Sequence, residues 1–139
     1  MSSVVRVAVS IQKELLQQFD KLCRKRSYAN RSEAIRDLIR NRLVDEEWHS
    51  GRGDTVGTVT LVYDHDVLDL PSRLTKLQHE NEKTVVSTTH VHLDRHNCLE
   101  VLILRGPAKK VKELGESLTS VKGVKHGKFT MTTTGKSLR

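Results

Sequence analysis

Two histidines and a cysteine lie in one short segment, His90-Val91-His92-Leu93-Asp94-Arg95-His96-Asn97-Cys98. Imidazole and thiolate groups are ligands for transition metals such as Ni, Cu and Zn. Side chains two residues apart in a strand point to the same face, so a strand here places His90 and His92 side by side. The segment therefore predicts a metal site; the alternative is a polar strand face beside a small buried cysteine.

A β-hairpin is the element that can bring these donors together. Residues 84–92 are rich in β-branched side chains, residues 94–97 are typical of a turn, and residues 98–104 are typical of a returning strand. A loop centred on Arg95 sets His92 opposite Cys98 and His90 opposite Glu100. Opposed side chains have Cβ atoms roughly 4.5–5.5 Å apart, which suits chelation. Glu100 is then placed to orient a ligand imidazole; the alternative is a charged residue on a strand face.

The positive charge is concentrated near the N-terminus. The 139 residues carry a formal net charge of +7, and residues 1–44 hold ten Lys or Arg against four Asp or Glu, compared with fourteen against thirteen in the remainder. The first third is thus where we expect a polyanion to bind. Two cysteines in different contexts do not form a secreted disulfide framework, and no apolar run suits a bilayer span or a signal peptide. These features predict a cytoplasmic protein with no membrane partner.

A short strand and two helices are predicted for the first third. Apolar residues alternate with polar or small ones from Val5 to Ser10, which favours a strand, and Ser10 is expected to cap the first helix. Asn30 and Glu33 have the spacing of a capping box, so a second helix begins there and runs to about Trp48. The apolar faces of the two helices comprise Leu15, Leu16, Phe19, Leu22 and Cys23, and Ala34, Ile35, Leu38, Ile39 and Leu43, respectively.

A single strand needs a partner, because its backbone N–H and C=O groups are otherwise unpaired. Pairing with the same strand of a second chain forms a ribbon that presents Arg6, Ala8 and Ser10 twice and fits the DNA major groove. This pattern resembles the ribbon-helix-helix family of bacterial transcription factors, which implies that Arg31 and Ser32 also contact DNA. Ala8 offers only an apolar contact where such ribbons commonly carry a hydrogen-bonding side chain. The alternative is a basic dimerisation domain that binds no nucleic acid.

The remainder of the chain predicts a second domain of α+β class. We expect a ribbon-helix-helix (βαα) domain at residues 1–48, a linker at 49–54, a second domain at 55–134 and a tail at 135–139. Within the second domain, strands are expected at residues 55–63, 84–93, 98–105 and 124–133, with helices at residues 71–79 and 107–118. This βαββαβ order is that of a ferredoxin-like fold.

The two domains together resemble the nickel-responsive regulators, whose second half is ACT-like. The segments that carry this resemblance are Asn30-Arg31-Ser32-Glu33-Ala34-Ile35-Arg36-Asp37, Gln78-His79, His90-Val91-His92 and Asn97-Cys98-Leu99-Glu100. The resemblance implies one square-planar Ni(II) per chain, held by His90, His92 and Cys98 of one chain and by His79 of another.

Further roles follow from the same resemblance. It implies that Tyr63 and His65 lie near the metal, and that Glu33 and Asp37 lie near a monovalent cation such as K+ between the domains; neutralisation by Arg36, Arg40 or solvent is the alternative. It also implies a homotetramer, a dimer of dimers, that binds double-stranded operator DNA more tightly with Ni(II) and represses nickel uptake genes.

Several alternatives remain open at this point. The donors also suit Cu or Zn, so the chain could sense another metal, or bind metal without binding DNA. An antitoxin would share the ribbon but would usually carry a disordered tail in place of the second domain. An enzyme with an open metal site and Glu100 as base is the remaining rival. We expect that the chain is not an enzyme, because His79 completes the ligand set of the metal and the sequence shows no group of residues suited to binding a substrate.

Overall fold

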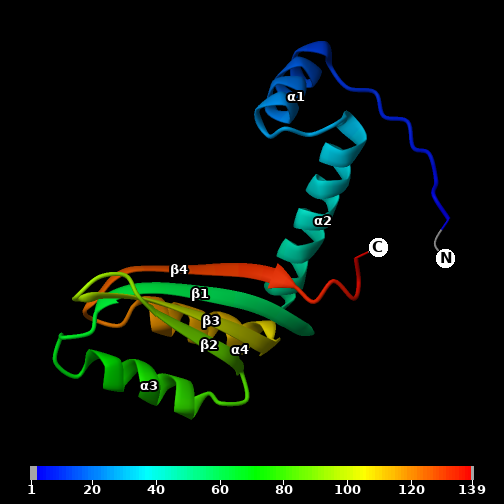
Figure 1. The fold of residues 1–139 in the computed structure, drawn as a ribbon. Coiled ribbons are helices and arrows are strands. Elements are labelled where there is room, and N and C mark those ends of the chain that lie inside the picture. The colour runs from blue at the N-terminus through cyan, green and yellow to red at the C-terminus, as the bar shows by residue number, and fades with distance from the viewer. Residues whose placement is uncertain (1–2, 139) are drawn as a thin grey trace. The chain divides into compact units, whose positions relative to one another are not determined.

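A computed structural model describes residues 3–138, which form two compact units (Figure 1). Of the described residues, the first unit comprises 3–43 together with Leu138, and the second runs from Val44 to Ser137. Among the described residues, no helix is both long and apolar enough to cross a membrane.

The first unit is built from helix α1 (Lys13–Lys25) and the start of helix α2 (Arg31–Ser50). Residues 3–12 form neither helix nor strand within one chain, and Val5, Val7 and Val9 are exposed. The predicted helical stripes are also largely exposed, although Cys23 and Ala34 are buried. A single chain thus leaves many apolar side chains of this unit in contact with water, as expected for a unit that needs a second copy.

Two predicted helix caps differ from the structure. Ser10 does not cap α1; Gln12 is the N-cap residue, and its side chain makes no capping hydrogen bond. Because α1 begins at Lys13, Ser10 lies two residues before the N-cap position from which a capping side chain bonds to the first helical N–H groups. At α2, the Glu33 N–H donates to Asn30 Oδ1 at 2.9 Å, which forms one half of the capping box. The other half is absent from the described contacts, because the Glu33 carboxylate pairs with Arg36.

The second unit confirms the predicted βαββαβ order. Its elements are β1 (Asp54–Asp64), α3 (Leu70–Glu80), β2 (Val85–His92), β3 (Asn97–Pro107), α4 (Ala108–Thr119) and β4 (Val124–Thr133). The sheet order is β2-β3-β1-β4, with every neighbouring pair antiparallel. Helix α2 ends at Ser50 and β1 begins at Asp54, so only residues 51–53 separate them where the sequence predicts a break at 49–54. Gly51 and Gly53 there have φ of 66° and 84°, which glycine adopts readily.

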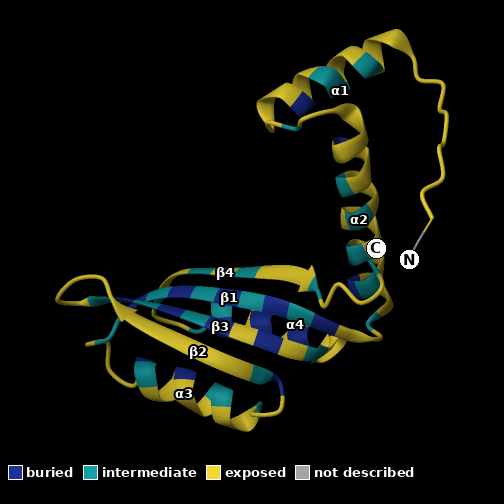
Figure 2. Cartoon of the chain, turned by 45° about the vertical axis from the view of Figure 1, so that its right-hand side comes forward, coloured by how far each residue is buried: buried dark blue, intermediate teal, exposed yellow. Residues whose placement is uncertain are grey.

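One face of the sheet packs against α3 and α4. Every second side chain of β1 is buried, and Figure 2 shows buried residues on β1, β3 and α4, whereas β2 is exposed along most of its length. The core joins Leu61 of β1 to Leu74 of α3 and Leu118 of α4. Trp48 extends this core: its ring lies edge-on to Phe129 at 5.8 Å, and its Nε1 donates to the Thr132 carbonyl at 2.8 Å.

Candidate metal centre

The register of the β2–β3 hairpin is the one that the sequence predicts. His92 pairs with Cys98, and His90 pairs with Glu100. Strand β1 lies on the other side of β3, where Tyr63 pairs with Cys98. The alternation of side chains therefore places all five of these residues on the face of the sheet that carries the helices.

The thiol of Cys98 is the point on which the nearby donors converge. Its Sγ lies 3.1 Å from Nδ1 of His65 and 3.5 Å from Nδ1 of His92. One ligand atom from each of these three residues lies within 4.8 Å of the others, a spacing that suits a shared metal ion. His65 thus contacts the thiol directly, two residues beyond the point where β1 pairs with Cys98.

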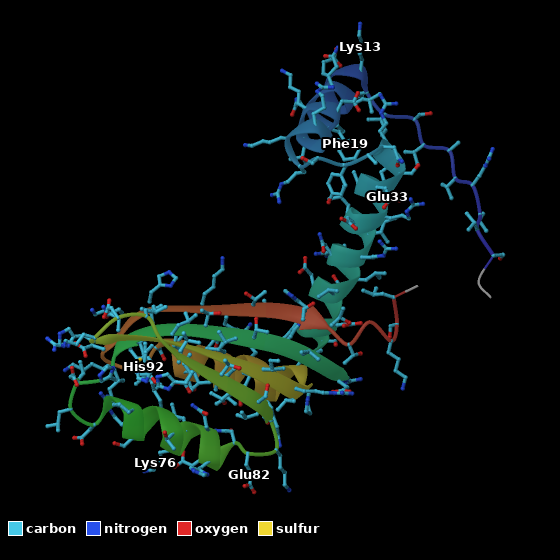
Figure 3. The ribbon with its side chains drawn as sticks, viewed as in Figure 1. Lys13, Phe19, Glu33, Lys76, Glu82 and His92 are labelled. Carbon is cyan, nitrogen blue, oxygen red and sulfur yellow. The ribbon has the colours of Figure 1, made fainter. Side chains whose placement is uncertain are left out.

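His90 lies beside this group of three. Its ring centroid is 5.3 Å from that of His92 and 6.1 Å from that of Tyr63. Both histidines of β2 are exposed, and Figure 3 shows His92 near the end of the hairpin. His79 is exposed on α3 and, among residues 3–138, belongs to no group of clustered donor atoms. A metal ion held by His90 and His92 is therefore accessible to a further ligand from outside the chain. His79 is likewise accessible to a metal ion held outside the chain.

Burial acts on the protonation of the Cys98 thiol. The side chain is fully buried, and desolvation raises the pKa of Cys98 above its ordinary value, with the carboxylates of Asp64, Asp66, Asp94 and Glu100 acting in the same direction. The thiolate is the form that binds metal. A cation at the thiol would reverse this effect, and its binding would release a proton.

The Glu100 carboxylate is buried, and it accepts two hydrogen bonds. Tyr63 OH donates to it at 2.7 Å, and Gln78 Nε2 donates to it at 2.8 Å. Burial, followed by this contact with Glu100, raises the pKa of Tyr63 above its ordinary value. The expected contact from Glu100 to a ligand imidazole is not among the contacts of the described residues. Gln78, which sequence reasoning noted only as the neighbour of His79, is instead the link from Glu100 to helix α3.

The turn between β2 and β3 is organised by Asp94. Its carboxylate accepts from the N–H groups of His96 and Asn97, each at 2.8 Å, and from Asn97 Nδ2 at 2.9 Å. These hydrogen bonds lower the pKa of Asp94 to about 2. Nδ1 of His96 lies 3.0 Å from Asp66 Oδ2, and this contact raises the pKa of His96. The turn therefore has a fixed internal geometry that sets the ends of both ligand-bearing strands.

The residues expected at DNA all lie in the first unit. Arg6, Ala8 and Ser10 are exposed, as is Ser32. The Arg31 guanidinium makes two hydrogen bonds to Asp20, at 2.8 and 2.9 Å, so its charge is partly neutralised within the chain.

The residues expected at a monovalent cation also have partners of their own. Glu33 pairs with Arg36, and Asp37 accepts from Tyr28 OH at 2.8 Å and lies 3.4 Å from Arg40. These contacts agree with the alternative interpretation, in which Arg36 and Arg40 neutralise the carboxylates of Glu33 and Asp37.

Comparisons with known proteins cover both units. Residues 56–132 match the NikR C terminal nickel binding domain, and residues 5–46 match the ribbon-helix-helix proteins of the copG family. The sequence is 56% identical to a Geobacter sulfurreducens protein and 53% identical to one from Nitratidesulfovibrio vulgaris, each over 138 residues and 99% of both chains. Both relatives are provisionally named nickel-responsive regulators. A solved, uncharacterised protein from Thermotoga maritima covers 58% of this chain with a TM-score of 0.51 and 15% identity, which shows the fold alone.

A ribbon-helix-helix unit joined to a ferredoxin-like unit with clustered nitrogen and sulfur donors defines a metal-dependent transcription regulator. The chain belongs to the NikR family of nickel-responsive regulators. The predictions of a ribbon-helix-helix domain, an ACT-like second domain and a nickel-dependent regulator rather than an enzyme are thereby confirmed.

Proposed function

We propose that the chain binds one Ni(II) through His90, His92 and Cys98, and that the partner subunit's His79 completes the ligand set. The observation that carries this proposal is the hairpin register, which puts His92 directly opposite Cys98 and His90 next to His92. Three imidazoles and a thiolate are a donor set that suits Ni(II) and also Cu(II). The exposure of His79, His90 and His92 supports a site that is closed by a second chain.

His65 is the alternative ligand within the chain, because its Nδ1 lies nearer to the Cys98 sulfur than Nδ1 of His92 does. A ligand set of His65, His92 and Cys98 needs no second chain. We assign His65 a supporting role, since Asp66 lies 3.4 Å from its Nε2 and the pair can hold the ring against the thiol. Zn or Cu sensing is the alternative at the level of function.

The assembly that we propose is a homotetramer, a dimer of dimers. Two chains pair through residues near Val5 to Ser10 as an antiparallel ribbon, and the exposed apolar faces of α1 and α2 pack together beneath it. The ribbons carry Arg6, Ala8 and Ser10 to operator DNA in the cytoplasm, with Arg31 and Ser32 nearby. Ni(II) raises operator affinity by favouring the arrangement of subunits that fits the DNA, and the regulated genes are those of nickel uptake, which are repressed. A K+ ion near Glu33 and Asp37 would have to displace the present contacts with Arg36 and Arg40.

The proposal is tested by titrating the full-length protein with Ni(II), Cu(II) and Zn(II) in turn, and by selecting bound duplexes from a random-sequence DNA pool after each addition. The expected result is one Ni(II) per chain and a defined operator sequence that is selected only with Ni(II). Selection of the same operator with Zn(II) alone would overturn nickel as the signal. Replacement of His90, His92 or Cys98 by Ala is expected to abolish stoichiometric uptake, and unchanged uptake would overturn the ligand set.

A further inference from the structure

Gln78 and His79 are neighbours on helix α3, but they point to different surroundings. Consecutive helical residues do not share a face. Gln78 is half-buried and donates to Glu100 of strand β3, whereas His79 is exposed. The helix therefore fixes one side chain to the sheet and presents the next to the outside.

The amide of Gln78 has its two ends fixed by two different strands. A carboxylate only accepts hydrogen bonds, so the NH₂ group must face Glu100. The carbonyl end then faces Thr88 of β2, whose hydroxyl donates to Oε1 at 3.1 Å. Both contacts agree on one orientation of the amide, which joins α3 to β2 and β3 at the same time.

Glu100 connects this amide to the metal centre. It pairs with His90 across the hairpin, and its second oxygen accepts from Tyr63, whose ring lies beside the ring of His90. The side chain is only 5% exposed, so removal of a partner would leave a buried carboxylate undercompensated. The Glu100 carboxylate thus lies beside the strand that carries His90, and through Gln78 it is hydrogen-bonded to the helix that carries His79.

Apolar packing anchors mainly the other end of α3. The buried residues of this helix are Leu70 and Leu74, in its first half, and Leu77 is partly buried. The position of its last turn, which carries His79, therefore depends more heavily on the contacts of Gln78.

We propose that Gln78 is a positioning residue that sets where α3 presents His79 to the neighbouring subunit. Its two hydrogen bonds hold the last turn of α3 at a fixed place on the sheet, in register with the hairpin of the same chain. This inference rests on the proposed ligand set, in which His79 binds the Ni(II) of another chain. Loss of the link leaves His79 present but misplaced, so affinity for Ni(II) falls without loss of a ligand.

A double-mutant cycle on the full-length protein tests the inference. Gln78→Leu and Gln78→Asn are made in the wild-type and His79→Ala backgrounds; Leu removes the amide, and Asn is too short to span both partners. Lys76→Ala is the matched control, because Lys76 lies on the outer side of α3 (Figure 3) and pairs only with Glu80 at 3.8 Å among the described ion pairs. Ni(II) affinity is measured against a competing chelator, and thermal unfolding is measured without metal.

Gln78→Leu and Gln78→Asn are expected to weaken Ni(II) binding about tenfold or more in the wild-type background, since a supporting contact to a ligand is typically worth about 10–100-fold. In the His79→Ala background the same changes are expected to alter affinity less than about twofold. Equal losses in both backgrounds would overturn the inference, because Gln78 would then act on the fold or the hairpin. Full affinity in the wild-type background would also overturn it.

The Ni(II) affinity of the His79→Ala variant alone shows whether the proposed ligand set is itself wrong. If His79→Ala alone leaves Ni(II) affinity unchanged, the proposed ligand set is wrong, and Gln78 has no ligand to position. If His79→Ala weakens binding while both Gln78 variants bind like the wild type, only the inference about Gln78 is wrong. Should Gln78→Leu unfold at the assay temperature, Gln78→Asn, which keeps a polar amide, decides between these outcomes.

Discussion

The Nδ1 atom of His65 lies 3.1 Å from the sulfur of Cys98. The same sulfur lies 3.5 Å from Nδ1 of His92, so two imidazoles of the same chain already lie next to the thiol before any partner chain contributes. We assign His92 to the nickel ligand set and His65 to support. His65→Ala is then expected to weaken Ni(II) binding about tenfold, and His92→Ala by far more. Chelator competition measures both, with the exposed His126→Ala of β4 as control. Equal losses for His65→Ala and His92→Ala would instead make His65 a ligand.

Removal of the Asp94 carboxylate is expected to loosen the turn that joins the two ligand-bearing strands. Asp94→Ala deletes the hydrogen bonds that the carboxylate accepts from His96 and Asn97, so both unfolding temperature and Ni(II) affinity should fall. Because the pKa of Asp94 is lowered to about 2 in the folded protein, its contribution to stability is present above the unfolded-state pKa of about 3.9. It is lost as the pH falls toward about 2.

The corresponding measurement is thermal unfolding of wild-type and Asp94→Ala protein across this range. The difference between the two should be constant above about pH 5 and shrink between about pH 4 and pH 2. A difference that grows on acidification would show that Asp94 does not act through its charged form. Glu82→Ala, at an exposed position before β2, is the control and should unfold like the wild type.

The core between α4 and the sheet is expected to be sensitive to loss of volume. Leu118 is fully buried, so Leu118→Ala should lower the free energy of unfolding by about 2–5 kcal/mol. Leu68, which is 83% exposed, should change it by less than about 0.5 kcal/mol when replaced by Ala. Denaturant titration measures both variants. Similar small effects at the two positions would mean that the core does not include α4 as described.

Arg6 is expected to act on DNA and not on metal. The side chain is exposed in the N-terminal segment that matches the ribbon-helix-helix family. If it binds a phosphate, Arg6→Ala should weaken binding to the selected operator and reduce the slope of log affinity against log salt concentration by about 1 for each phosphate that is no longer bound. Ni(II) stoichiometry should stay unchanged. Parallel loss of DNA and Ni(II) binding would indicate a folding defect and not a specific role of Arg6 at DNA.

The hairpin illustrates what the sequence alone can predict. The pairing of His92 with Cys98 follows from strand period and turn position, which are local properties, and the structure confirms it. The proximity of His65 to Cys98 depends on β1 lying beside β3, a pairing between segments more than thirty residues apart. The role of Gln78 depends on how α3 rests on the sheet. Neither relationship has a local signal, and only the resemblance to a family points to His65.

The helix caps show the opposite case, in which a local signal is misleading. Ser10 has the right residue type for an N-cap, but α1 begins at Lys13, after Gln12. Asn30 does cap α2, whereas Glu33 pairs with Arg36 because an oppositely charged side chain lies within reach on the same helix face. Residue type indicates where a cap can form, and competing partners decide whether it does.

The central claim is that the nickel site is completed by a second chain, and subunit mixing tests it most directly. His79→Ala and Cys98→Ala proteins are each expected to lack tight Ni(II) sites. The first variant lacks the imidazole that a chain contributes to its partner's site, and the second lacks the thiolate of the site in its own hairpin. Mixed subunits contain hairpins with an intact Cys98 next to a partner with an intact His79. Chelator competition on the mixture should therefore show tight Ni(II) binding that neither variant has alone. Absence of any recovery, in subunits shown to exchange, would contradict a site shared between chains.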